Sequence, residues 1–150
     1  VHALREALAD GTIDIVATDH APHPLEAKEC EWQEAAFGML GLETALSIVQ
    51  KTMVDSGMMN WEQVADRMSL APARIGRYAE QGQMIAKGSF ANLVVINPTK
   101  SWRVDRDLVL SNSSNTPYHG HELPGFVEHT LFKGKQTVIN GVVVSKGAQQ

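Results

Sequence analysis

Cysteine is nearly absent from this chain of 150 residues, and long apolar runs are missing altogether. The one cysteine, Cys30, excludes an internal disulfide and is typical of a protein from a reducing compartment. No stretch approaches the ~18 consecutive apolar residues of a membrane-spanning helix, and no signal-peptide pattern is visible. We therefore expect a cytoplasmic protein that does not associate with membranes.

Positive charge is also scarce. The chain carries 13 Lys and Arg residues against 17 Asp and Glu residues, for a net charge of −4. No basic run or stripe is present, which argues against a nucleic-acid partner. The length allows one ordinary hydrophobic core, but a complete β/α barrel needs roughly 200 residues or more.

Residues 14–23, DIVATDHAPH, are the most informative stretch. The apolar residues 15–17 show no alternation, which favours a strand covered on both faces, as in a parallel sheet. Pro22 cannot join a strand ladder, so the strand should end near Asp19. Catalytic groups of α/β folds collect at such strand ends, although these residues alone are equally consistent with a hydrogen-bonded turn.

Helical patterns surround this stretch. Residues 2–9 predict a helix that ends at Gly11. A second helix is predicted from Leu42 to Gly57 and a third after Asn60, where Gln63 would complete a capping box. The residues expected to face inward on these helices are Leu42, Leu46, Val49, Met53, Val64, Ala65 and Met68.

The pattern changes between residues 81 and 88, and strands are predicted after it. Residues 91–98 form a β-branched run closed by Pro98, and residues 126–132 form a second strand candidate. Residues 137–139 and 142–144 flank Asn140 and Gly141, a pair that favours a type I′ hairpin turn.

Three motifs together resemble the dihydroorotase branch of the amidohydrolase superfamily. They are residues 14–23 (DIVATDHAPH), residues 36–44 (AFGMLGLET) and residues 111–117 (SNSSNTP), the last followed by Gly120 and by residues 123–125 (LPG). The first motif is shared with hydantoinases and allantoinases. The other two make the resemblance fairly specific to dihydroorotases, and it extends over essentially the whole chain.

The resemblance implies an α/β fold. Residues 1–81 would supply the last strand and the C-terminal helices of a (β/α)8 TIM-type barrel, and residues 82–150 the C-terminal part of a small β-sandwich domain. Because the chain begins at Val1 instead of a methionine, we expect the C-terminal part of a longer enzyme. The earlier barrel strands would then lie upstream. The β domain would also lack the N-terminal strands that pack against it in the family.

The implied activity is the interconversion of N-carbamoyl-L-aspartate and L-dihydroorotate in de novo pyrimidine biosynthesis. Metal-bound hydroxide would attack the amide carbonyl, with Asp19 as metal ligand and as general acid and base. His23 would contact the carboxylate of the small-molecule substrate, and Phe37 and Gly38 would supply backbone contacts. His20 has no assigned role in this scheme.

Most of the implied metal site has no counterpart in the sequence. The family holds a pair of zinc ions with a His-X-His pair, a carboxylated lysine and two further histidines, none of which has a matching position here. One carboxylate does not make a zinc site, so this chain alone should be inactive. His119 and His121 have the zinc-ligand spacing, but they lie in a Gly-rich loop between prolines and are predicted not to bind metal.

Other reactive residue types receive no catalytic role. Lys28, in a polar loop, has no predicted burial, and no motif accompanies Cys30. Arg74 is expected to form a surface or structural ion pair, and His129 is expected to be structural.

Three alternatives remain open from the sequence. The first is a hydantoinase or allantoinase, with the same metal chemistry and another substrate pocket. The second is a non-catalytic dihydroorotase-like subunit that scaffolds aspartate transcarbamoylase. The third is an independent binding domain. For the enzyme we expect a homodimer or an association with aspartate transcarbamoylase.

Overall fold

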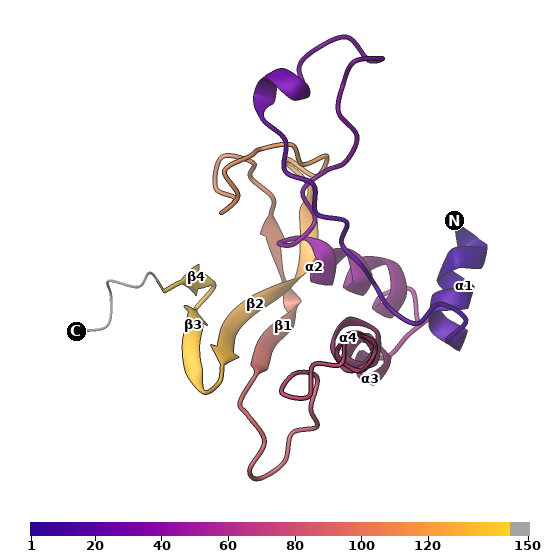
Figure 1. The fold of residues 1–150 in the computed structure, drawn as a ribbon, viewed down its shortest axis with the longest axis vertical. Coiled ribbons are helices and arrows are strands. Elements are labelled where there is room, and N and C mark those ends of the chain that lie inside the picture. The colour runs from indigo at the N-terminus through magenta and orange to yellow at the C-terminus, as the bar shows by residue number, and fades with distance from the viewer. Residues whose placement is uncertain (145–150) are drawn as a thin grey trace.

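Helices occupy the first half of the chain and strands the second (Figure 1). The structure is a computed structural model that describes residues 1–144. The helices are α1 (His2–Asp10), α2 (Ala45–Val49), α3 (Trp61–Ala65) and α4 (Ala71–Gly76), with a 3-10 turn η1 (Leu25–Ala27) and π-helical turns η2 (Gln50–Val54) and η3 (Asp66–Leu70). The strands are β1 (Leu93–Arg103), β2 (Glu122–Phe132), β3 (Lys135–Ile139) and β4 (Val142–Val143).

Helix α1 ends as its sequence predicts. Gly11 follows it with φ 93°, a left-handed conformation that glycine adopts without a Cβ penalty. The Asp10 carboxylate accepts a hydrogen bond from the backbone N–H of Thr12 at 2.8 Å. This bond holds the pKa of the Asp10 carboxyl below its usual value.

Two longer helical segments follow, each built from consecutive turns of different winding. The first joins α2 to η2 and ends near Gly57, which has φ 75°. The second joins α3, η3 and α4, and it opens with the predicted capping box between Asn60 and Gln63. Pro72 lies at the start of α4. Because proline has no N–H and its ring collides with the carbonyl four residues earlier, it explains the wider turn η3 just before it.

The helical core is centred on buried apolar side chains from α2, η2, α3 and the loop before α3. These are Val49, Met53, Met59 and Val64, with exposed fractions of 2–6%. The inward orientation predicted for Met53 is therefore confirmed, and Met68 packs against this core while partly buried. The inward orientation predicted for Leu42 and Ala65 is wrong: Leu42 precedes the helix and is 63% exposed, and Ala65 is exposed.

The four strands form one antiparallel sheet in the order β1-β2-β3-β4. Strand β1 does not end at Pro98 as expected. It continues to Arg103 because a register shift between Asn97 and Ser101 leaves Pro98 outside the ladder, where its missing N–H costs nothing. Strand β2 begins at Glu122, four residues earlier than predicted.

The predicted hairpin is formed between β3 and β4. Asn140 and Gly141 both have positive φ, 51° and 79°, as a type I′ turn requires. Lys133 and Gly134 repeat this geometry between β2 and β3, with φ 50° and 82°.

Buried hydrogen bonds join the helices to the sheet. Ser47 of α2 is 2% exposed; its hydroxyl donates to the Gly125 carbonyl at 3.1 Å and accepts from the Trp102 indole N–H at 2.9 Å. The Gln50 side-chain amide donates to the Pro98 carbonyl at 2.8 Å. Helix α2 with η2 therefore connects the two halves of the chain.

The strand predicted within residues 14–18 is not formed among the described residues. This segment crosses from α1 towards the upper loop without a neighbouring strand (Figure 1). The backbone N–H of Val16 donates instead to the Arg67 carbonyl at 3.1 Å, at a helix, and Ala17 is exposed. A strand exists only through its ladder, and no chain within residues 1–144 supplies one here. No helix in the described part of the chain is long and apolar enough to cross a membrane.

Candidate active site

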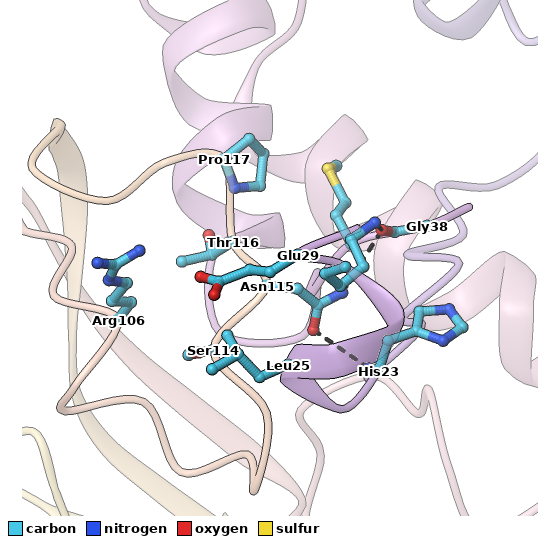
Figure 2. Close-up of a pocket in the computed structure, with 11 residues that line it drawn as sticks. His23, Leu25, Glu29, Gly38, Arg106, Ser114, Asn115, Thr116 and Pro117 are labelled. Carbon is cyan, nitrogen blue, oxygen red and sulfur yellow. Dashed lines mark hydrogen bonds between the residues drawn. The ribbon is translucent and has the colours of Figure 1, made fainter. Parts of the chain in front are cut away.

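Three segments far apart in the sequence meet at the side chain of Asn115 (Figure 2). Its Nδ2 donates to the Ala21 carbonyl at 2.9 Å and to the Gly38 carbonyl at 3.4 Å. Its Oδ1 accepts from the backbone N–H of His23 at 3.3 Å. The backbone carbonyl of Asn115 also accepts from Leu40 N–H at 3.1 Å. One residue of the third motif therefore ties the first motif to the second.

The first two motifs also contact each other directly. The backbone N–H of Ala21 donates to the Met39 carbonyl at 2.9 Å, within an isolated parallel bridge between His20 and Met39. The ring Nδ1 of His20 accepts from the N–H groups of Gly41 and Leu42 at 3.1 and 3.4 Å. This Nδ1 is therefore the unprotonated ring nitrogen, and His20 has a structural role that the sequence did not reveal.

Gly38 lies where the two motifs touch, and only glycine fits there. Its φ is 102°, a conformation that other residues rarely adopt. A Cβ at this position would lie 2.5 Å from the Ala21 Cβ and 3.7 Å from the His23 Nε2. The close approach of Gly38 to Ala21 requires the absence of a side chain, whereas the distance to His23 is an ordinary contact.

The polar loop between the two motifs is fastened by Lys28. Its Nζ donates to the Ala36 carbonyl at 2.7 Å and to the Gly38 carbonyl at 3.0 Å. Lys28 follows directly after η1, whose single turn brings its ammonium group back over the end of the loop. Lys28 is therefore half-buried and bonded to backbone, unlike the solvated lysine expected of a polar loop.

A cavity of about 520 Å³ opens beside these contacts. Its lining combines residues of all three motifs with the polar loop and one arginine, as Figure 2 shows. The lining residues are His23, Leu25, Lys28, Glu29, Gly38, Met39, Arg106, Ser114, Asn115, Thr116 and Pro117. The side chains of Lys28 and Arg106 carry positive charge against the one carboxylate, Glu29, so the charge of the lining favours an anionic ligand.

The predicted site residues are only partly brought together. His23 and Gly38 line the cavity. Asp19 and Phe37 do not, and the Phe37 side chain is 97% exposed. Asp19 is also exposed and has φ 43°, a left-handed conformation that Asp and Asn adopt more readily than other non-glycine residues.

The described side chains around Asp19 do not make up a set of metal ligands. Residues 1–144 contain no cluster of three or more His, Cys, Asp or Glu side chains that could hold a metal ion. Asp19 has no neighbouring ligand set, and the Nδ1 of His20 is already occupied by backbone donors. The described residues therefore do not form a metal site by themselves, and Asp19 as a ligand remains a prediction.

The histidines with zinc-ligand spacing lie in a turn before β2. The Nδ1 of His119 accepts from the backbone N–H of Arg106 at 3.2 Å. The ring of His121 packs edge-on against Tyr118, with ring centroids 6.0 Å apart. Both rings thus have local structural contacts, and His129 lies in β2 with a buried Nδ1.

Sequence reasoning missed the contributions of Lys28, Asn115 and Arg106. Asn115 lies in the third motif, so the sequence indicated its importance. Nothing in the sequence indicated what its side-chain amide would bind. Lys28 and Arg106 gave no signal, because their partners are backbone groups or an open cavity. Arg74 has no ion-pair partner within residues 1–144, contrary to expectation, and Cys30 is exposed.

Curated proteins named dihydroorotase are similar to this chain over most of its length. It is 58% identical over 141 residues to a dihydroorotase of Streptomyces coelicolor, covering 94% of this chain and 33% of that protein. It is 48% identical to a dihydroorotase of Mycobacterium tuberculosis, with the same two shares covered. The chain thus spans about a third of the length of the curated relatives it matches.

Solved structures agree in fold. An L-hydantoinase (dihydropyrimidinase) from Arthrobacter aurescens superimposes with a TM-score of 0.86 at 31% identity, covering 95% of this chain and 32% of that one. A D-hydantoinase (dihydropyrimidinase) from Thermus sp. gives the same TM-score at 28% identity, covering 98% and 33%. The sequence model of the amidohydrolase family matches residues 1–144, and this chain belongs to that family.

Proposed function

We propose that the full-length protein is a dihydroorotase that reversibly cyclises N-carbamoyl-L-aspartate to L-dihydroorotate in de novo pyrimidine biosynthesis. The observation that carries the proposal is the convergence of His23 and Gly38 on one cavity whose charged lining residues are mostly basic. Relatives that are 40–58% identical and named dihydroorotase support it. The cytoplasm is the proposed location.

The proposed architecture follows from the same relationship. Residues 1–81 would complete a (β/α)8 barrel, and residues 82–150 would complete a β-sandwich domain. The structural likeness to a hydantoinase over 98% of the chain supports this division into two domains. The unpaired segment at residues 14–18 would then gain its neighbouring strands from the rest of the protein.

Asp19 is the proposed proton carrier. In the hydrolytic direction a water oxygen adds to the ring amide carbonyl, and Asp19 takes a proton from that water. The C–N bond then breaks, and Asp19 returns the proton to the departing nitrogen. Asp19 suits this role because it is exposed in the middle of the first motif and has no hydrogen-bond partner among the described side chains.

Substrate binding is proposed for His23, Phe37 and Gly38. His23 would contact the substrate carboxylate, and the backbone of Phe37 and Gly38 would contact the ring. A metal, expected to be a pair of zinc ions, would take most of its ligands from outside the described residues, with Asp19 as one of them. The chain by itself is therefore expected to be inactive.

A hydantoinase is the second candidate, because the solved structures that superimpose at a TM-score of 0.86 are hydantoinases. The two differ in the substrate carboxylate, which dihydroorotate carries and hydantoin lacks. A homodimer and an association with aspartate transcarbamoylase remain predictions for the full-length protein.

A substrate panel on the full-length protein separates these proposals. We expect hydrolysis of dihydroorotate, with hydantoin, dihydrouracil and allantoin turned over far more slowly. Preferential turnover of hydantoin or dihydrouracil would overturn the dihydroorotase proposal in favour of the second candidate. A folded protein that is inert on all four substrates would support a non-catalytic subunit.

A further inference from the structure

The Gly38 carbonyl is held by two side chains from different parts of the chain. Lys28 Nζ donates to it at 3.0 Å and Asn115 Nδ2 at 3.4 Å. Both donors also line the cavity, so these contacts lie at its wall. Figure 2 labels Asn115 and Gly38 at this wall. A carbonyl with both lone pairs engaged is fixed in direction.

Lys28 fixes the backbone on both sides of Phe37. Its ammonium binds the Ala36 carbonyl at 2.7 Å as well as the Gly38 carbonyl. All peptide bonds of the described chain are trans, so the N–H of each peptide points away from its carbonyl. With the Ala36 carbonyl turned towards the ammonium, the Phe37 N–H must point to the opposite side.

Asn115 fixes the relation of this backbone to His23. The same side-chain amide binds Gly38 and Ala21 through Nδ2, and the backbone N–H of His23 through Oδ1. A shift of Gly38 relative to His23 would break at least one of these bonds. The amide therefore sets the distance between the two elements of the cavity wall.

We propose that Lys28 and Asn115 are positioning residues that lock the Phe37–Gly38 backbone against His23, so that a ligand meets these groups already in place. The identity of the ligand rests on the proposed dihydroorotase function, but the lock itself does not. Holding the binding groups in advance avoids the cost of ordering them when substrate binds.

The two kinetic constants should therefore respond differently. The lock acts on binding groups and does not contact Asp19, so its loss should weaken substrate binding more than turnover. A hydrogen bond from a charged donor has a strength that corresponds to roughly a tenfold to hundredfold change in an equilibrium constant. Backbone amides near Phe37 should also exchange with solvent faster once the carbonyls are released.

Lys28→Met removes all donors and keeps the length of the side chain. In the full-length protein we expect KM for dihydroorotate to rise roughly tenfold or more, kcat to fall less than about threefold, and amide exchange to quicken in a peptide covering residues 35–40. Lys28→Arg, which retains charge and several donors, should recover much of both effects. Lys87→Met is the matched control, because Lys87 is exposed in a distant loop.

Asn115 tests the lock from the other side. Asn115→Asp keeps the acceptor for His23 N–H but places a carboxylate oxygen against the carbonyls of Ala21 and Gly38. Its KM and its exchange at residues 35–40 should be raised at least as much as in Asn115→Ala. An Asn115→Asp protein that behaves like the wild type would overturn the role of the Nδ2 donor, whatever the effect of Lys28→Met.

Failure of the inference and failure of the proposed function give different results. Unchanged exchange at residues 35–40 in both Lys28→Met and Asn115→Asp overturns the lock, even if the protein is a dihydroorotase. If the wild type is inert on dihydroorotate but the variants show faster exchange, the lock stands and the proposed function fails. Should Lys28→Met not fold, Lys28→Ala, which also lacks any side-chain donor, carries the same comparison.

Discussion

The ring Nδ1 of His20 accepts a hydrogen bond from the backbone N–H of Gly41 at 3.1 Å. The two residues lie in different motifs, and a Cβ on Gly41 would approach the Thr18 carbonyl to 2.7 Å. The middle of the first motif is thus packed directly against the segment that leads into helix α2. His20 orders the backbone between Asp19 and the cavity without lining the cavity itself.

Two replacements of His20 should distinguish the contribution of Nδ1 from that of Nε2. Asn carries an acceptor at the same distance from the backbone as Nδ1, whereas Gln carries one at the position of Nε2. We expect His20→Gln to lower the free energy of unfolding of the full-length protein by about 1–2 kcal/mol and His20→Asn by less. Denaturant unfolding measures this order, and the reverse order would contradict a role through Nδ1.

Gly38→Ala should damage the site through one identifiable collision. The new Cβ would lie 2.5 Å from the Ala21 Cβ, and the next contacts, at 3.7 and 3.9 Å, are ordinary. Adding Ala21→Gly should therefore restore part of the activity lost in Gly38→Ala. Full recovery is not expected, since alanine at φ 102° retains about 1–2 kcal/mol of backbone strain. A double variant as impaired as the single one would exclude the collision as the cause.

Asp19→Asn should lower kcat of the full-length enzyme by roughly 10²–10⁴-fold, because the amide cannot carry the proton. Asn is the suitable replacement because it tolerates the left-handed conformation of Asp19. Asp14→Asn is the control, since Asp14 is an exposed carboxylate of the same motif. Near-normal turnover in Asp19→Asn would remove this residue from catalysis.

Ser47→Ala should weaken the contact between the helices and the sheet. The substitution removes the buried Ser47 hydroxyl, which is the hydrogen-bond partner of both the Trp102 indole N–H and the Gly125 carbonyl. We expect a loss of about 1–3 kcal/mol in unfolding free energy. Ser56→Ala should change it by less than about 0.5 kcal/mol, because Ser56 is exposed and water can replace its bond to Thr52. Equal effects in thermal unfolding would argue against the buried relay.

Local sequence determined the features that depend on neighbouring residues alone. The stop of α1 at Gly11, the capping box of Asn60 and Gln63 and the turn at Asn140 and Gly141 all follow from short-range backbone preferences. The family resemblance was likewise readable from contiguous motifs and is confirmed by the match over residues 1–144.

Tertiary structure decided the features that depend on distant partners. Residues 14–18 have an apolar pattern typical of a strand, but a strand needs a neighbour that residues 1–144 do not provide. The roles of Lys28, Asn115 and His20 were equally hidden, because each binds backbone groups, and a backbone carbonyl or N–H has no signature in the sequence. The sequence therefore determined which residue types could act, and the packing of three separated motifs decided which of them meet.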